Sequence, residues 1–88
     1  MPCYLVESFL ARGDAGERSA RELRARLAAE ELSRTGKHVQ FDRAIHVPED
    51  EICFFVFSAP SHHDVVMLAQ RAGLDPLRVI EAVPSGEE

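Results

Sequence analysis

The sequence predicts a small α+β domain in which strands and helices follow the order β-α-β-β-α-β. Residues 52–57 (ICFFVF) are apolar at every position, as expected for a strand that is covered on both faces. Segments 19–36 and 61–73 each begin with a helix-capping residue, carry apolar side chains at helical spacing and end at a glycine. The remaining strands are predicted from apolar runs at 4–10, 39–47 and 79–83.

The first helix is predicted from a capping motif. A loop over residues 11–18 follows the first strand, and Ser19 with Glu22 then forms a Ser-x-x-Glu box. We therefore expect the helix to begin at Ser19 and to end at Gly36. Its buried face is expected to comprise Ala20, Leu23, Leu27, Ala28 and Leu32. A ladder of alternating charge is expected to face solvent: Glu22, Arg26, Glu30 and Arg34.

The second half of the chain gives a strand, an acidic turn at 48–51, the apolar strand and a second helix. In the strand 39–47, simple alternation puts Phe41, Ile45 and Val47 on one face. It puts Gln40, Asp42, Ala44 and His46 on the other face. Ser61 and Asp64 are expected to cap the second helix, and Gly73 to end it in a left-handed conformation. The helix is expected to bury Val65, Leu68, Ala69 and Ala72.

This order of elements is typical of the ferredoxin-like fold, a four-stranded antiparallel sheet with both helices on one face. We expect the first and third strands to be central, parallel neighbours, which would bring Cys3 near Cys53. Two helices cover only one face of such a sheet, yet residues 52–57 require cover on both. A second copy of the sheet is the simplest cover, so we predict a homodimer of the dimeric α/β barrel type.

Composition limits the classes of function. The 88 residues form one predicted domain over 1–84, with a polar tail at 85–88. A net charge of −5 argues against a nucleic-acid surface. No apolar run approaches the roughly 20 residues of a membrane span, and no export signal is visible, so a cytoplasmic location is expected. The two cysteines are interpreted as small buried residues of a reducing compartment.

The opening MPCYLVE, residues 1–7, resembles the start of a family of small ferredoxin-like domains. Most members of that family have no known function, and some are described as nickel-binding proteins. The resemblance continues at residues 19–24, 57–61, 71–73 and 78–83. It implies a dimer with packed sheet faces and a site for a metal or small ligand. Members often carry an acidic residue where this chain has Ser58, and a histidine where it has Leu68, so two natural ligands are missing here.

A metal site in this chain would depend on other residues. Nickel or zinc favours imidazole ligands, and the candidates are His46 and, less favoured, His62. His62 and His63 are adjacent on a helix and point about 100° apart, so they cannot easily chelate one ion. They are more simply solvated residues at the helix start. His46 is expected on a strand face that lines the dimer cavity.

Three classes of function stay open. A small dimeric binding protein would use ligand-binding residues His46, Tyr4, Glu7 and Arg43. A plain dimerisation or interaction module would need only the apolar strand. A cofactor-free monooxygenase or isomerase would be consistent with the architecture, but no spacing marks a nucleophile or a carboxylate pair. The sequence therefore predicts binding first, interaction second and catalysis last.

Overall fold

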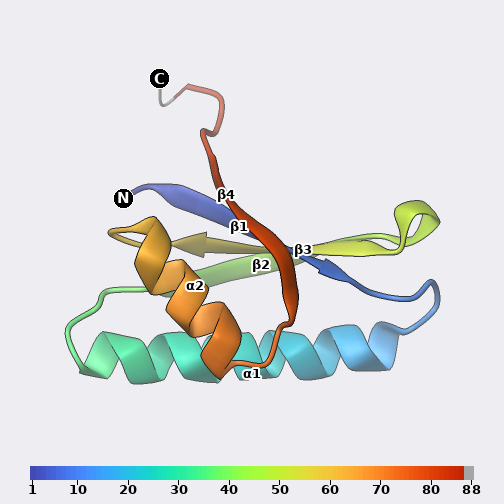
Figure 1. Ribbon diagram of the computed structural model, residues 1–88, viewed down its shortest axis with the longest axis horizontal. Coiled ribbons are helices and arrows are strands. Elements are labelled where there is room, and N and C mark those ends of the chain that lie inside the picture. Colours follow the sequence, from blue (N-terminus) through green and yellow to red (C-terminus); the bar gives the residue numbers. More distant parts are fainter. Residues whose placement is uncertain (87–88) are drawn as a thin grey trace.

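The computed structural model describes residues 1–86 and contains four strands and two helices in the predicted order (Figure 1). The strands are β1 (Cys3–Phe9), β2 (Gln40–Val47), β3 (Ile52–Ser58) and β4 (Pro76–Ala82). The helices are α1 (Ala15–Arg34) and α2 (His62–Arg71), and a short 3-10 turn, Pro48–Asp50, joins β2 to β3. The ferredoxin-like α+β class is thereby confirmed.

The four strands form one sheet in the order β2-β3-β1-β4, and every neighbouring pair is antiparallel. The expectation that β1 and β3 are parallel was wrong, although both strands are central. Because α1 connects β1 to β2 as a crossover, these two strands run the same way. The tight turn after β2 then reverses the chain, so β3 must oppose β1.

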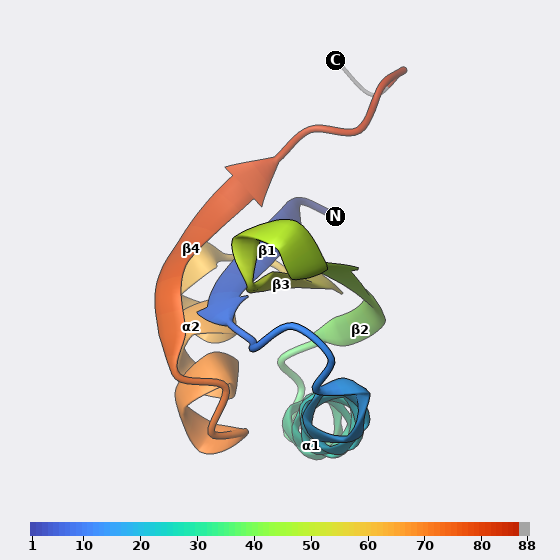
Figure 2. The same ribbon diagram turned by 90° about the vertical axis from the view of Figure 1, so that its right-hand side faces the viewer.

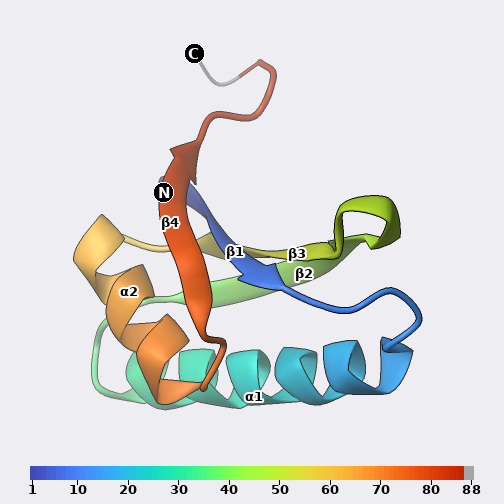
Figure 3. The ribbon, with the colours of Figure 1, turned by 45° about the vertical axis from the view of Figure 1, so that its right-hand side comes forward.

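Both helices lie on one side of the sheet, and the other side is not covered by any described element (Figures 2 and 3). Helix α1 lies beneath the β2 side and α2 beneath the β4 side, where each makes its main contact with the sheet. The core between the two layers is built around the rings of Phe55 and Phe57, both fully buried. Burial of such large apolar side chains is a major favourable contribution to the stability of a small domain.

Helix α1 begins four residues before the predicted start. Asp14 is the N-cap, and its carboxylate accepts a hydrogen bond from the Glu17 backbone N–H at 3.1 Å. Ser19 lies inside the helix and is exposed. The Ser-x-x-Glu pattern therefore does not mark the start of the helix. The earlier Asp14 already accepts a hydrogen bond from a backbone N–H group of the first turn.

The buried face of α1 agrees with the prediction only in part. Ala28 and Leu32 are buried as predicted, and Ala25 and Ala29 are buried with them. Ala20 is exposed, and Leu23 and Leu27 are 55% and 53% exposed. Large side chains from the sheet explain this choice, because Phe55, Phe57 and the partly buried Phe41 fill the space below the strands. Small residues allow α1 to approach those rings closely.

Strand β2 contains an irregularity that reverses the predicted faces. Phe41 pairs with Phe57 and Arg43 with Val56, so Asp42 is an extra residue in the ladder. Because of this bulge, Phe41 faces the helices whereas Ile45 faces the opposite side. The prediction that these two residues share a face was wrong.

Helix α2 follows the prediction closely. The Ser61 hydroxyl accepts a hydrogen bond from the Asp64 backbone N–H at 3.2 Å, and the four predicted apolar positions are buried. Gly73 adopts φ +67°, and the N–H of Leu74 bonds to the Ala69 carbonyl at 3.0 Å. This is the Schellman arrangement expected of a glycine-terminated helix.

The described chain ends in a short exposed segment after β4. Ser85 and Gly86 are exposed, and the last two residues of the predicted tail, 87–88, lie outside the described residues. No helix within residues 1–86 has the length and apolar character needed to cross a membrane.

Candidate functional site

The sheet surface opposite the helices, here called the open face, is an apolar surface that no described element covers. Its apolar members come from all four strands: Leu5, Phe9, Ile45, Val47, Ile52, Phe54, Val56 and Ile80. Ile45 and Phe9 are 47% and 50% exposed, whereas the central Val56 is only 8% exposed because its neighbours on the sheet surround it. The two-sided apolar character of residues 52–57 is thus accounted for by the core on one side and the open face on the other.

Charged side chains also lie on the open face: Arg43 and Arg78 on the two edge strands, and Glu7 on the central strand β1 beside Phe54. Glu7 on β1 pairs in register with Arg78 on β4, and the Arg78 Nε donates a hydrogen bond to a Glu7 carboxylate oxygen. Arg43 lies on β2 in register with Val56 and forms an ion pair with Asp42 at 3.2 Å. An apolar surface that carries a few charged side chains, most of them at its rim, is the usual composition of a protein interface.

The four predicted ligand-binding residues do not come together in the monomer. Tyr4 and His46 are in register with the helix-facing residues Phe57 and Cys53, whereas Glu7 and Arg43 lie on the open face. Glu7 and Arg43 are also separated by β3, a distance of roughly 10 Å for two strand spacings. Their shared ligand role stays a prediction, which would require a ligand or partner that bridges them.

His46 lies on the opposite sheet face from the one we expected. The bulge at Asp42 turns it toward the helices, where it stands in register with the fully buried Cys53. Its Nε2 lies 3.4 Å from the Leu10 carbonyl oxygen, a long contact across the end of the sheet. His46 therefore does not line the cavity that a second sheet would enclose.

His62, the second predicted metal ligand, lies on α2 and has protein partners on β4 and β1. Its Nε2 lies 2.8 Å from the Val79 carbonyl oxygen, to which it donates, and its ring packs edge-on against Tyr4 at 6.0 Å. Among residues 1–86, no three His, Cys, Asp or Glu side chains are grouped so that they could hold a metal ion. Metal binding would therefore require donors from more than one chain or a rearrangement of the side chains.

The two cysteines lie on opposite faces of the sheet, since Cys3 pairs with Ser58 and Cys53 with Ser8. The antiparallel arrangement separates them along the strands, so the predicted approach of the two thiols does not occur. Burial raises the pKa of the Cys53 thiol above its ordinary value, an effect to which Glu22 adds and which Arg18 and Arg21 oppose. A buried thiol with a raised pKa is a poor nucleophile.

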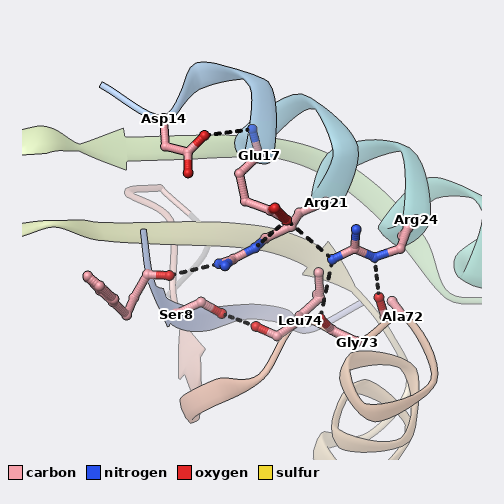
Figure 4. Close-up of polar contacts among 9 residues, drawn as sticks. Ser8, Asp14, Glu17, Arg21, Arg24, Ala72, Gly73 and Leu74 are labelled. Atoms are coloured by element: carbon pink, nitrogen blue, oxygen red, sulfur yellow. Dashed lines mark hydrogen bonds and ion pairs between the residues drawn. The ribbon is translucent and has the colours of Figure 1, made fainter. Parts of the chain in front are cut away.

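A polar network between the helices and β1, which sequence patterns did not reveal, holds the helix layer in place (Figure 4). Arg24 of α1 donates to the Ala72 carbonyl at 2.8 Å and to the Gly73 carbonyl at 3.3 Å, which satisfies the end of α2. The fully buried Ser8 hydroxyl donates to the Leu74 carbonyl at 2.8 Å. The contacts shown in Figure 4 join the helices to each other and to β1, and no buried polar side-chain atom within residues 1–86 lacks a hydrogen-bond partner.

Arg21 and Glu17 complete the same network at the start of α1. Arg21 donates to the Phe9 carbonyl at 2.7 Å and lies 3.3 Å from a Glu17 carboxylate oxygen. The same Glu17 oxygen is 3.7 Å from Arg24. These contacts fasten the first half of α1 to the end of β1 and make the helix layer a rigid support for the open face.

Comparison with known proteins supports the fold. The chain is similar to SCO4226 from Streptomyces coelicolor A3(2), whose crystal structure matches with a TM-score of 0.71 over 96% of this chain and 99% of that chain. The two sequences are 20% identical, a level at which the likeness establishes the fold alone. No protein-family model and no curated protein matches this chain. The predicted link to nickel-binding domains stays a prediction.

Proposed function

We propose that this protein functions as a homodimeric module in which the open faces of two copies pack together. The observation that supports this proposal is the continuous apolar surface on one side of the sheet, centred on Val56 and Phe54. Monomeric proteins rarely expose large contiguous apolar patches, and such patches usually mark interfaces. Two sheets packed face to face would cover this surface, with side chains interdigitating across a layer about 10 Å thick.

A second copy is the occupant that the charge pattern favours. A two-fold interface is self-complementary, so each patch meets the same patch of the partner. The apolar side chains can meet their copies without burying an unpaired charge, because Glu7 is already paired with Arg78 and Arg43 lies on the edge strand β2. An acidic or basic protein partner would find little opposite charge on this face.

The dimer is tested by placing a charge on the open face at a position that the monomer already exposes. Ile45→Asp is expected to leave the fold intact and to weaken dimerisation by about a thousandfold, because each dimer would bury two unpaired carboxylates. Sedimentation velocity measures the change. An equal dimer population in Ile45→Asp and the wild type would contradict the proposal.

Leu27→Asp is the matched control. Leu27 is 53% exposed against 47% for Ile45, but it lies on the outer side of α1. The Leu27→Asp substitution should leave the proportion of dimer unchanged. Phe55 would be an unsuitable test position because it is fully buried beneath the sheet, so its replacement by a charge would unfold the domain.

A more specific proposal is that the dimer binds a small ligand or a metal ion between its two sheets. Glu7 and Arg43 lie on the face that a partner would cover, so they are the predicted residues best placed to border an enclosed site. Native mass spectrometry with added Ni²⁺ or Zn²⁺ tests the metal hypothesis. Retention of stoichiometric metal that Glu7→Gln abolishes and His63→Ala preserves would support it, because Glu7 is the carboxylate on the face that a partner would cover. A dimer that retains no metal would contradict it.

A further inference from the structure

A groove between α1 and the edge strand β2 differs from the open face in composition and position. It has a volume of about 620 Å³, within the usual range of small-molecule sites. Its walls include Arg26, Glu30 and Arg34 of α1, and its floor includes Ala29, Val39 and Phe41. In Figure 2, α1 lies beneath the β2 side of the sheet, so this groove is on the flank of the molecule.

Arg26 is held in place by an aromatic contact and has no acidic partner among residues 1–86. Its guanidinium carbon lies 5.2 Å from the centre of the Phe41 ring, which itself packs against Phe55 and Phe57 in the core. Among residues 1–86, neither Arg26 nor Arg34 is in an ion pair, whereas the arginines nearer the start of α1 all are. A stacked guanidinium still presents its N–H groups at its edge, where a carboxylate can bind in bidentate fashion.

The charged side chains of the groove complement an anion. Two arginines and one glutamate leave an excess of positive charge there, although the whole chain carries −5. The apolar floor of Ala29, Val39 and Phe41 suits a small hydrocarbon body beside that anion. The ladder of charges on α1 is therefore more than a solvated face, because two of its arginines border a recess with an apolar floor.

We propose that this groove binds a small carboxylate that has an apolar or aromatic body. The carboxylate is held by Arg26, with Arg34 adding favourable charge, and the body lies over Val39 and Phe41. The site uses none of the apolar residues of the open face, so it does not depend on dimerisation. A protein that failed to dimerise could still bind such a ligand here, and the reverse also holds.

A pair of nearly isosteric probes tests the proposal: 3-phenylpropanoate and its uncharged amide, titrated against the ¹⁵N-labelled protein and followed by NMR. The carboxylate is expected to shift amide signals of residues 26–41 saturably and to bind at least about tenfold more tightly than the amide, because of the charge-assisted hydrogen bonds. Equal affinity of the two probes would overturn the proposal. So would the absence of a saturable shift in this segment up to about 10 mM.

Three variants locate the interaction. Arg26→Gln is expected to remove the preference for the carboxylate over the amide, whereas Arg12→Gln, an exposed arginine outside the groove, should retain it. Glu30→Gln should strengthen carboxylate binding by about twofold because a like charge is removed. Weaker binding in Glu30→Gln, or an unchanged preference in Arg26→Gln, would show that the ligand is not held in this way.

Discussion

At the residue scale, the start of α1 depends on Asp14 rather than on Ser19. Asp14→Ala is expected to lower the free energy of unfolding by about 1 kcal/mol through loss of the cap. Ser19→Ala should raise it by a few tenths of a kcal/mol, to about 0.5 at most, because alanine is the better residue inside an exposed helix. Urea denaturation measures both. A destabilised Ser19→Ala beside an unchanged Asp14→Ala would place the helix start at Ser19.

Cys53 gives the protein a specific dependence on pH. Because the pKa of Cys53 is raised in the folded state, the unfolded chain ionises this thiol first as the pH rises past 9.0, the ordinary value. The stability of the wild type should therefore fall relative to Cys53→Ala above that pH. Parallel stability curves for wild type and Cys53→Ala in denaturant titrations between about pH 7 and 10 would contradict this assignment.

Local sequence predicted the capped end of α2 but not the bulge in β2. Ser61 bonds to Asp64 at the start of the helix, and Leu74 bonds to Ala69 across Gly73 at its end. Each of these contacts joins residues at most five positions apart, so its pattern can be recognised along the chain. The bulge at Asp42 depends on which residues of β3 pair with β2, and alternation alone could not reveal it. One extra residue was enough to move His46 from the expected face to the other.

At the scale of whole elements, the end of α2 requires a glycine. Gly73 has φ +67°, and a Cβ there would meet only the Arg24 Nε at 3.9 Å, so backbone conformation rather than crowding sets the cost. Gly73→Ala is expected to destabilise the protein by about 1 kcal/mol. Gly16→Ala, in the first turn of α1 with open space around it, should stabilise by up to about 1 kcal/mol. Thermal unfolding of both variants checks the signs, and a stabilised Gly73→Ala would contradict the left-handed assignment.

The packing of α1 shows what periodicity could not decide. Leu23 and Leu27 mark one possible apolar face, and Ala25 with Ala29 marks another. The sheet selects the alanines because its phenylalanine rings already occupy the space between the layers. That choice depends on the size of side chains far away in sequence, and it also directs Arg26 and Arg34 toward the groove beside β2.

At the scale of the whole molecule, the order of elements and the one-sided helix layer were predictable from the sequence. The direction of β3 relative to β1 follows from the connections and was assigned wrongly. The apolar run 52–57 correctly indicated two apolar faces, and the structure separates them into a core and an open face. The polar contacts among Arg24, Ser8 and the end of α2 join segments distant in sequence, so no local pattern could reveal them.

The most direct test of the central proposal is the mass of the untagged wild-type protein in solution, measured by sedimentation equilibrium over a range of concentrations. Packing of two open faces predicts about twice the chain mass of 9.8 kDa, with dissociation only on dilution. A mass of one chain at every concentration would contradict the proposal. The open face would then be a surface that this protein leaves exposed or uses for a different partner.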